Sequence, residues 1–590
     1  IMLATFLAGI GAGSIIFAPY ADNRKNPLAW FAALEAVIGL ASILSIFVYG
    51  ELPFIFFSLK EAFAERFWLF LFIQFLLCAS IMIIPTLCMG AVFPLAGKIY
   101  ARRLKAVGKG VGEAYFFNTA GSIFGAFAGG FILIPVLGAQ NGVIVTAGLN
   151  IAIACALLWA ARMSPFAKAA ASIALTIAFA ISVIALPTWD QMMMTLGLYA
   201  NPANKEEVQG LRARPPERLL FYKEGINAII TVREGGPDGG IISYQANGKQ
   251  EARSINGKPP VAWSLLGHLP LLLHPGNPQE ALVVGLGSGI TLGGMERYPL
   301  ASIDVVELEP AVVEAAGFFR ESNNNALDDP RVKLHIADGR KFASLMTKKY
   351  DIIVSGVSDP WITGVSNLFT YEYFGELNER LEHDGVVALW FQNYRVTPRE
   401  LKTGLNTFAS VFPYASVWFH YTDALDLIVI GSKEPLKFDM ARLEEVTSSP
   451  SVKEGLRKID INGPFDIVDL FLIGGSDLRS YIAGSPLNTD ERPLLEFTLP
   501  RLLYSDPSIG IKNIEELLSH AEDLTPPLTI AEGEEEEFYL GLGKTYNRSN
   551  FRLPQSLKAF KKVLELNPGN KEAKYYIRGI EAEMESRPEN

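Results

Sequence analysis

The first 190 residues contain six apolar runs, at about 1–20, 28–49, 67–97, 114–137, 142–161 and 169–187. A helix of roughly 20 apolar residues is long enough to cross the hydrocarbon core of a bilayer. The third run is too long for one perpendicular helix and too short for two, and Pro85 and Pro94 within it predict a kink or a break. The sequence therefore predicts a multi-pass α-helical membrane region at 1–190, with about six helices embedded in a lipid bilayer.

Charge separates this region from the remainder of the chain. Residues 1–190 hold 11 Lys/Arg and 7 Asp/Glu, a net of +4; the whole chain has 52 and 62, a net of −10, which leaves −14 for residues 191–590. Nine basic residues fall on alternate loops: Arg24, Lys25, Lys98, Arg102, Arg103, Lys105, Lys109, Arg162 and Lys168. Because basic loops stay in the cytoplasm, six crossings predict that the domain after Trp189 lies on the extracytoplasmic side.

The same composition bears on two other classes of protein. A nucleic-acid platform needs a basic face to neutralise phosphates, so the acidic soluble part argues against a nucleic-acid partner. An ion or proton carrier usually places several carboxylates within its membrane helices, whereas Glu35 is the one acidic residue inside a predicted span. Transport is therefore a weaker hypothesis. Glycines recurring every fourth residue, at 9 and 13 and at 121, 125 and 129, predict close helix packing instead.

Short strands precede a longer α/β pattern in the soluble part. The alternating stretch at 228–232 and the turn Asn247-Gly248 predict a small β subdomain over 191–275. From 276 to 500 the sequence shows seven strand-like runs, at 281–286, 303–308, 332–336, 350–354, 385–391, 415–421 and 425–430. Helical segments separate the early ones, which is typical of a parallel, Rossmann-like sheet.

Several strand ends carry residues suited to a nucleotide. The first strand runs into a loop containing Gly285, Gly287, Ser288 and Gly289, where glycines allow a tight turn and a close approach of backbone to ligand. Glu307 ends the next strand about 20 residues later, where a carboxylate accepts hydrogen bonds from a ribose diol. Asp338-Gly339 follows the third strand, and this aspartate can accept from an adenine amino group. Simple helix caps are the alternative role for Glu307 and Asp338, but strand-end features in this order favour nucleotide binding.

Longer motifs carry a family resemblance. They are Met89-Gly-Ala-Val-Phe-Pro94, Gly112-Glu-Ala-Tyr-Phe-Phe-Asn-Thr-Ala-Gly121, Val305-Val-Glu-Leu-Glu-Pro310, Asp329-Pro-Arg-Val332, Asn367-Leu-Phe-Thr370 and Asn488-Thr-Asp-Glu-Arg-Pro493. With them, residues 219–433 resemble the spermidine synthase family of aminopropyltransferases, and the chain is most similar to its membrane-fused bacterial branch. The resemblance implies a class I methyltransferase fold, decarboxylated S-adenosylmethionine or a related nucleoside as co-substrate, a polyamine as acceptor, and a place in the bacterial inner membrane.

The departures from the family pattern fall on its chemistry. In Ser355-Gly-Val-Ser-Asp-Pro360, Gly356 stands where the family has its general-base aspartate, whereas Asp359 matches the second aspartate, which holds the amine. Ser288 replaces an aspartate that binds the aminopropyl ammonium, and Ala262-Trp-Ser264 replaces three polar substrate contacts. A general base contributes roughly 10²–10⁴ in rate, so ordinary aminopropyl transfer is disfavoured. The alternative is a non-catalytic scaffold or accessory subunit.

Metal chemistry has no support in the sequence. The six histidines show no metal-ligand spacing, and the three cysteines, Cys78, Cys88 and Cys155, all lie in the apolar region. We therefore predict no metal site and no disulfide scaffold.

The C-terminal tail has its own pattern. Pro526-Pro527 and the acidic run 532–537 predict a linker over 501–536. Residues 537–590 then predict a single tetratricopeptide-like helical hairpin, from the pattern Tyr539, Leu542, Gly543, Tyr546, Ser556, Phe560, Val563 and Pro568. One repeat buries too little surface to stand alone, so we expect it to pack on this chain or on a protein partner. We expect the membrane helices to contact such a protein partner as well.

Overall fold

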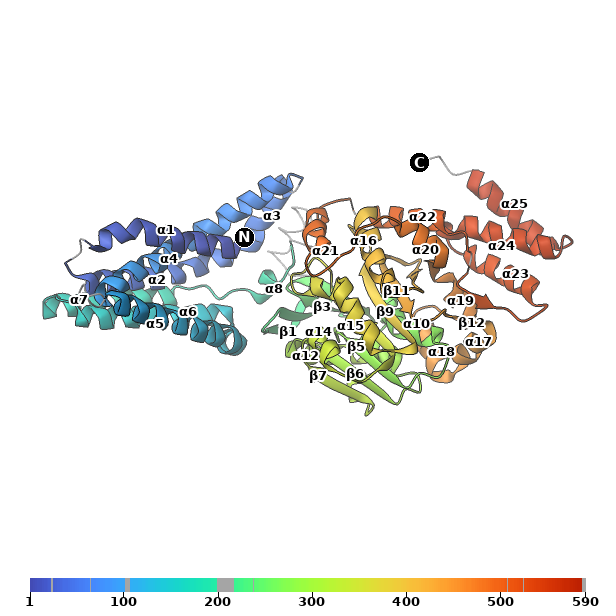
Figure 1. Cartoon of the computed structure of the whole chain (residues 1–590), viewed down its shortest axis with the longest axis horizontal. Coiled ribbons are helices and arrows are strands. Elements are labelled where there is room, and N and C mark those ends of the chain that lie inside the picture. The colour runs from blue at the N-terminus through green and yellow to red at the C-terminus, as the bar shows by residue number, and fades with distance from the viewer. Residues whose placement is uncertain are drawn as a thin grey trace. The chain divides into compact units, whose positions relative to one another are not determined.

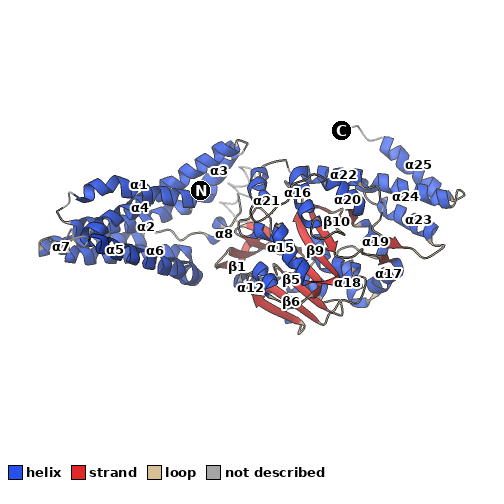
Figure 2. Ribbon diagram, viewed as in Figure 1, coloured by secondary structure: helices blue, strands red, loops and turns tan. Residues whose placement is uncertain are grey.

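The computed structural model describes residues 1–22, 25–63, 65–100, 107–198, 217–236, 238–506, 508–523 and 525–585. Arg24, Arg102, Arg103 and Lys105, which entered the topology prediction, lie outside these ranges. The chain divides into two compact units, Ile1–Thr231 with Ala246–Lys249, and Val232–Gln245 with Gln250–Asn590. The first is mainly helical and the second combines a large sheet with helices (Figures 1 and 2).

Helices occupy the apolar runs of the first unit. They are α1 Met2–Asp22, α2 Pro27–Tyr49, α3 Leu52–Phe63, α4 Phe67–Tyr100, α5 Val107–Ala128, the π-helical turn η2 Gly129–Leu133, α6 Ile134–Ala160, α7 Pro165–Ile184 and α8 Gln191–Met194. By length and composition, five helices of the described chain are long and apolar enough to cross a membrane. Gly108–Ala160 counts as one of the five, although Gly138 interrupts it with a non-helical φ of 79°. The six predicted apolar runs thus coincide with six helical segments: α1, α2, α4, α5 with η2, α6 and α7.

Helix α4 continues through both of its prolines. It spans 34 residues and contains Pro85 and Pro94, so the alternative of a break within this run is wrong. Proline is tolerated inside apolar helices because neighbouring groups satisfy the backbone that it frees.

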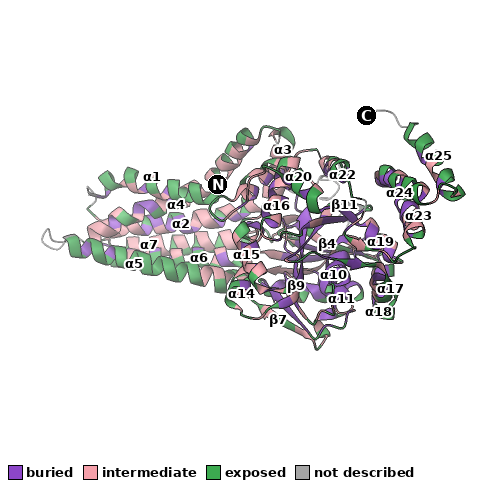
Figure 3. Ribbon diagram, turned by 45° about the vertical axis from the view of Figure 1, so that its right-hand side comes forward, coloured by how far each residue is buried: buried purple, intermediate pink, exposed green. Residues whose placement is uncertain are grey.

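The glycine repeats behave differently on two helices. A Cβ added to Gly13 would lie 2.1 Å from the Leu87 carbonyl oxygen, and one on Gly90 would lie 2.2 Å from that of Ile10. Backbone contact between α1 and α4 therefore confirms the packing prediction for Gly9 and Gly13. At Gly121, Gly125 and Gly129, a Cβ would meet no described atom within 4 Å, so the predicted packing is not seen there. Helix α5 is instead largely exposed (Figure 3).

A four-stranded sheet follows the helices. Its strands, in spatial order, are β1 Arg218–Glu224, β2 Ile229–Gly235, β3 Ile241–Ala246 and β4 Lys249–Ile255. Asn247 and Gly248 have φ values of 50° and 79°, which confirms the predicted two-residue hairpin turn.

The main sheet has eight strands in the order β13-β10-β11-β9-β8-β5-β6-β7. Their bounds are β5 Glu280–Val284, β6 Ser302–Glu307, β7 Val332–Ile336, β8 Tyr350–Ser355, β9 Leu381–Gln392, β10 Ser416–His420, β11 Asp423–Ser432 and β13 Phe471–Gly474. Strands β5 to β9 are parallel, whereas β11 is antiparallel to its neighbours β9 and β10. The predicted Rossmann-like fold is confirmed. From β5, the chain adds β6 and β7 on one side of the sheet and then β8 and β9 on the other. Open sheets of this kind bind ligands at the point between β5 and β8 where the strand order reverses. Strand β13 was not predicted.

Helices cover this sheet. They are α10 Val261–Leu273, α11 Ile290–Met295, α12 Pro310–Ala316, α13 Arg320–Asn323, α14 Gly339–Leu345, α15 Tyr371–Arg380, α16 Pro398–Ala409, α17 Met440–Ser448, α18 Pro450–Arg457, α19 Pro464–Asp469, α20 Gly475–Ile482, α21 Leu494–Thr498 and α22 Ile509–His520. The sheet strands are largely buried between them (Figure 3), which explains their near-continuous apolar sequence.

Two predicted boundaries need correction. Helix α10 was assigned to the β subdomain, but it is buried along nearly its whole length and packs on α11 and β9 as part of the Rossmann-like domain. The linker prediction over 501–536 is wrong at α22, because Ile514 and Leu517 are fully buried in the main core. The sequence was read as a linker because prolines and an acidic run lie close to the apolar residues of α22.

The C-terminal region forms the expected helical hairpin. Its helices are α23 Glu535–Tyr546, α24 Leu553–Leu566 and α25 Lys571–Glu585. A Cβ on Gly543 would lie 2.8 Å from the Phe560 ring, so α23 and α24 make close contact there. The Phe538 ring packs on that of Phe465 in α19, with centroids 5.7 Å apart. The hairpin therefore packs on its own chain, one of the two alternatives that the sequence left open. A short parallel pair joins β12 Phe438–Asp439 to β14 Leu528–Thr529, which precedes α23 in the chain.

Candidate functional site

The glycine loop follows β5 at the carboxyl edge of the sheet. Gly285, Gly287 and Gly289 have φ values of 89°, 54° and 77°, a region that side chains other than glycine rarely adopt. A Cβ on Gly285 would also lie 3.0 Å from the Gly356 carbonyl oxygen, whereas a Cβ on Gly287 would meet no described atom within 4 Å. The loop is thus tightly held at its start and faces open space at its middle.

Ser288 contributes its backbone to this loop. Its carbonyl oxygen accepts a hydrogen bond of 2.9 Å from the Asn323 amide, and the same amide nitrogen would lie 3.0 Å from a Cβ on Gly289. Asn323, in α13, is 3% exposed. A serine side chain carries no charge, so this position offers no carboxylate to an ammonium group.

Glu307 braces the glycine loop. It is the last residue of β6 and is buried. One carboxylate oxygen accepts from the Leu286 N–H at 3.0 Å and the other from the Glu309 N–H at 2.9 Å. Burial raises the pKa of this carboxyl, while its backbone hydrogen bonds oppose the rise. The Leu308 and Gly287 backbone N–H groups also interact with this carboxylate, so Glu307 fixes the start of the glycine loop.

Asp338 lies after β7 and is exposed. Its carboxylate accepts from the Lys341 N–H at 2.9 Å, which makes it the N-cap of α14. Next to it, a Cβ on Gly339 would lie 2.5 Å from a Val284 methyl group, so this loop lies directly beside the end of β5. Asp338 therefore acts as a helix cap, and its second oxygen remains on the same edge of the sheet as the glycine loop.

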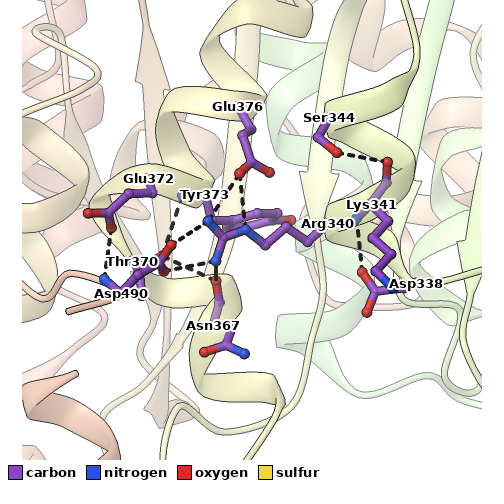
Figure 4. A network of polar contacts seen from close by, with 10 residues as sticks. All are labelled: Asp338, Arg340, Lys341, Ser344, Asn367, Thr370, Glu372, Tyr373, Glu376 and Asp490. Atoms are coloured by element: carbon purple, nitrogen blue, oxygen red, sulfur yellow. Dashed lines mark hydrogen bonds and ion pairs between the residues drawn. The ribbon is translucent and has the colours of Figure 1, made fainter. Parts of the chain in front are cut away.

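Arg340 anchors this loop to the sequence motif at 488–493 (Figure 4). Its guanidinium donates to the two carboxylate oxygens of Asp490 at 2.8 and 2.7 Å, and to Glu376 at 3.0 and 3.1 Å. The Asn488 amide in turn donates to the Phe369 carbonyl at 2.8 Å. The resemblance motifs at 367–370 and 488–493 thus hold the loop beside the candidate nucleoside site in place.

Gly356 lies between the glycine loop and α10. Its N–H donates to the Val284 carbonyl at 3.0 Å, and a Cβ at this position would lie 3.2 Å from a Leu266 methyl group. A side chain at 356 would therefore begin against an apolar helix. Glycine provides no side chain at this position that could act as a general base.

Asp359 is completely buried. The Tyr394 hydroxyl donates to one of its oxygens, and the neighbouring Ser358 hydroxyl donates to Glu251 at 2.8 Å. Tyr394 follows β9 and Glu251 lies in β4, so three distant segments supply polar groups here. Sequence reasoning missed Tyr394 and Glu251. Tyr394 had a usable signal, because it comes two residues after a strand that neighbours β8.

Two polar atoms close to these segments in sequence are buried without a partner. Among the described residues, Trp361 Nε1 and Gln392 Oε1 make no hydrogen bond. Gln392 ends β9, and its amide nitrogen donates to the Tyr394 carbonyl at 3.2 Å. A buried polar atom without a partner is costly, which makes this acceptor and this donor candidates for contact with a ligand.

The substituted positions at 262–264 lie in α10. Ala262 and Ser264 are buried within the helix, and the Trp263 ring stacks on Trp390, with centroids 5.3 Å apart and planes 20° from parallel. This segment therefore contributes packing rather than polar substrate contacts.

The histidines have structural surroundings. His268 is buried, its Nδ1 lies 2.9 Å from the Tyr298 hydroxyl, and burial lowers its pKa to about 3. His274 lies near Asp351 and Asp384, with potential metal-binding atoms all within 4.8 Å, a grouping that sequence spacing did not reveal. However, His274 Nδ1 accepts from the Gly276 N–H at 3.0 Å, so Nε2 of the neutral ring carries the proton and is a donor rather than a metal ligand. The three cysteines are free.

Comparison with known proteins identifies the domain that contains this site. Residues 261–435 match the family described as "Spermine/spermidine synthase domain". A polyamine aminopropyltransferase of Clostridium perfringens is 32% identical over 157 residues, which cover 26% of this chain and 55% of that protein. Polyamine aminopropyltransferase 1 of Streptomyces coelicolor is 24% identical over 402 residues, 66% of this chain and 68% of that protein. Residues 261–435 therefore form a spermidine synthase-like domain with polyamine aminopropyltransferase homologues.

Solved structures of similar proteins include a spermidine synthase in complex with the transition-state analogue AdoDATO, at 20% identity and a TM-score of 0.36. This match covers 45% of the chain and 88% of that structure. The spermidine synthase from Thermotoga maritima gives 21% identity and a TM-score of 0.35, over 45% of the chain and 87% of that structure. The chain spans about half the length of the Clostridium relative, 55%.

Proposed function

We propose that the spermidine synthase-like domain binds an S-adenosylmethionine-type nucleoside, decarboxylated S-adenosylmethionine being the form that the family resemblance implies. The observation that carries this proposal is the convergence of four strand ends on one edge of the sheet. Glu307 bonds to Leu286, Gly339 lies against Val284, and Gly285 lies against the Gly356 carbonyl. In this arrangement Glu307 holds the ribose, Asp338 the base, and residues 285–289 the remainder of the nucleoside.

The amine side of the reaction has a different character. Asp359 and Glu251 provide two carboxylates around Ser358 and Tyr394, and Gln392 Oε1 is a buried acceptor without a described partner. These groups suit a cationic amine. With glycine at 356 and serine at 288, deprotonation of that amine would depend on Asp359 or on water, so we propose weak or altered aminopropyl transfer.

We further propose that α1, α2, α4, the α5–α6 segment and α7 anchor the protein in the bacterial inner membrane. Their length and composition support this, as does exposure of large apolar side chains on α5: Phe116, Phe117 and Phe124 are 65%, 61% and 73% exposed. Lipid is the environment in which such a surface is stable.

Isothermal titration calorimetry with methylthioadenosine tests the nucleoside proposal. The purified chain should bind this probe, and Glu307→Gln should weaken binding about tenfold through loss of one charged acceptor. Glu314→Gln, a change of the same kind in α12, serves as the control. Turnover of decarboxylated S-adenosylmethionine with putrescine should fall for Asp359→Asn. Absence of any nucleoside binding would overturn the proposal.

A second candidate function is that of a non-catalytic accessory subunit. Gly356, Ser288 and the packed segment 262–264 favour it, since each removes a polar group that the family uses. The membrane helices and the C-terminal hairpin would then bind protein partners. Gentle detergent extraction should recover a stable hetero-complex in that case, whereas a monomer with robust turnover would refute it.

The side of the membrane decides between these candidates. The distribution of basic loops predicts that the soluble domain lies on the extracytoplasmic side, away from cytoplasmic nucleosides. The test uses a variant in which the three natural cysteines are replaced and Asp238→Cys is introduced in the exposed turn between β2 and β3. This cysteine should react with an impermeant thiol reagent in intact cells. Lys25→Cys is the matched control and should be protected. Protection of both would place the domain in the cytoplasm and favour the enzyme.

A further inference from the structure

The C-terminal hairpin has a groove along α25, here called the hairpin groove. Its cavity has a volume of about 730 Å³, and Asn547, Lys571, Lys574, Tyr575, Arg578 and Glu583 contribute to its lining. Asn547 follows α23, so the groove lies between the first and third helices of the hairpin. Ile580, which is buried with Ala573 in the small core of the hairpin, also lines this cavity, so the groove reaches from that core to the exposed side of α25.

The cations of this groove are set apart from the acidic residues of the same helix. Lys571, Lys574 and Arg578 are all exposed, and within the described chain none of them makes an ion pair. Two acidic residues of α25 are paired with other helices instead: Glu572 with Lys544 at 2.8 Å and Glu581 with Lys561 at 3.8 Å. Three cations and the carboxylate of Glu583 give the groove a net charge of +2, on a chain whose net charge is −10.

The form of the groove favours a peptide over a lipid surface. Tyr575 is 75% exposed and provides an aromatic wall, and no described atom lies within 4 Å of a Cβ placed on Gly579, which keeps the floor open. The Asn547 side chain can donate to and accept from a peptide backbone. A concave site with an aromatic wall suits a polypeptide segment, whereas a bilayer needs an outward-facing basic surface.

We infer that the hairpin groove binds an acidic peptide segment of a partner protein, with Lys571, Lys574 and Arg578 facing its carboxylates. This inference deepens the docking role proposed for the hairpin and rests on it, and it does not depend on turnover by the Rossmann-like domain. Complementary charge at exposed sites raises the rate of association and selects the partner, so binding should weaken as salt increases.

Fluorescence anisotropy on the purified full chain in detergent tests this. The probe is a fluorescein-labelled peptide of alternating glutamate and alanine, and its comparison is the same peptide with glutamine. The glutamate peptide should bind at low salt, and the triple variant Lys571→Glu, Lys574→Glu, Arg578→Glu should weaken it at least about tenfold. Lys558→Glu, an exposed residue of α24 outside the groove, makes the same kind of charge change and should leave affinity unaltered.

Three outcomes would overturn the inference: equal binding of both peptides, no effect of the triple variant, or an equal effect of Lys558→Glu. Cosedimentation with phosphatidylglycerol vesicles is the remaining arm. Vesicle binding that the triple variant abolishes, without peptide binding, would assign the groove to anionic lipid and reject the peptide. Lys574→Gln provides a milder variant if the triple variant unfolds, and should weaken peptide binding about threefold. The peptide assay uses the purified chain and a synthetic peptide, without any partner protein. Its result is therefore independent of whether detergent extraction recovers a hetero-complex.

Discussion

Gly285 and Gly356 approach each other where two neighbouring parallel strands end, and a Cβ on Gly285 would lie 3.0 Å from the Gly356 carbonyl oxygen. Strands β5 and β8 pair up to Val284 and Ser355, and the Gly356 N–H continues the pairing with a bond to the Val284 carbonyl. The glycine loop and Gly356 are therefore one connected piece of backbone. Substitutions at either glycine test how the candidate site is built.

Gly285→Ala should damage the nucleoside site. The backbone there has φ 89°, and alanine adds both strain and a close contact with the Gly356 carbonyl. We expect a loss of about 1–3 kcal/mol of stability and at least about tenfold weaker methylthioadenosine binding by calorimetry. Gly317→Ala is the control, since a Cβ there meets no described atom within 4 Å. An unaltered affinity in Gly285→Ala would show that the loop does not contact the nucleoside.

Gly356→Asp should not restore a general base. The new side chain would begin 3.2 Å from the Leu266 methyl group, so crowding and burial of a carboxylate beside an apolar helix should cost about 1–3 kcal/mol. Turnover of decarboxylated S-adenosylmethionine with putrescine should remain at or below that of the unmodified chain. Gly356→Ala separates the effect of the Cβ from that of the charge. A rise of roughly 100-fold in Gly356→Asp would mean that this position does face the amine.

Arg340→Gln should destabilise the spermidine synthase-like domain. It removes the charged hydrogen bonds to Asp490 and Glu376 (Figure 4), and each hydrogen bond to a charged group contributes roughly 1.5–3 kcal/mol when buried. Both partners are partly exposed, so we expect the lower end of that range for the whole network. Thermal unfolding followed by tryptophan fluorescence measures it, with the exposed Lys341→Gln as control.

The same network predicts a pH dependence. Arg340 lowers the pKa of Asp490 below its usual 3.8. A carboxyl with a lowered folded-state pKa contributes stability above its unfolded pKa, and that contribution is lost as the pH falls through the folded value. The difference between Arg340→Gln and the unmodified chain should therefore be constant from pH 7 to pH 5 and shrink below about pH 4. A difference that persists in full at pH 2 would contradict this account.

His268 predicts an acid sensitivity at higher pH. Its pKa is lowered from 6.5 to about 3 by burial, so the unfolded chain binds this proton more readily and stability falls as the pH drops below 6.5. At 1.36 kcal/mol per pH unit, the loss between pH 6.5 and pH 5 is about 2 kcal/mol. His268→Gln keeps a hydrogen-bonding side chain and should remove this part of the slope. The free energy of unfolding is measured at pH 7, 6 and 5 for both proteins. If it falls equally with pH in His268→Gln and in the unmodified chain, His268 does not control the acid sensitivity.

Most of the strands and the glycine loop were predictable because their signals are local. Buried parallel strands are continuous apolar runs, and φ values that favour glycine place glycine at 285, 287 and 289. Glu307 and Asp338 were located correctly at their strand ends for the same reason. The hydrogen bond from the Lys341 N–H to Asp338 was also within reach, since an aspartate before a helix usually accepts from nearby backbone. The bond from Leu286 to Glu307 instead depends on the pairing of β5 with β6.

Contacts between distant segments could not be predicted in this way. The Tyr394 hydroxyl reaches Asp359 across 35 positions, and Ser358 reaches Glu251 across 107. Helix α22 was taken for a linker because its apolar stripe lies between proline-rich and acidic stretches. Each of these depends on which surfaces meet after the chain folds, and no local pattern encodes that.

The residue sequence alone thus determined the apolar first 190 residues and the acidic remainder, the order of the strands along the chain, and the presence of glycine at position 356. Folding brought four strand ends to one edge, turned position 356 toward Leu266, and gathered Lys571, Lys574 and Arg578 beside Tyr575. The first group follows from composition and periodicity, which act over a few residues. The second depends on packing between elements far apart in the chain, where burial and excluded volume select the contacts that are made.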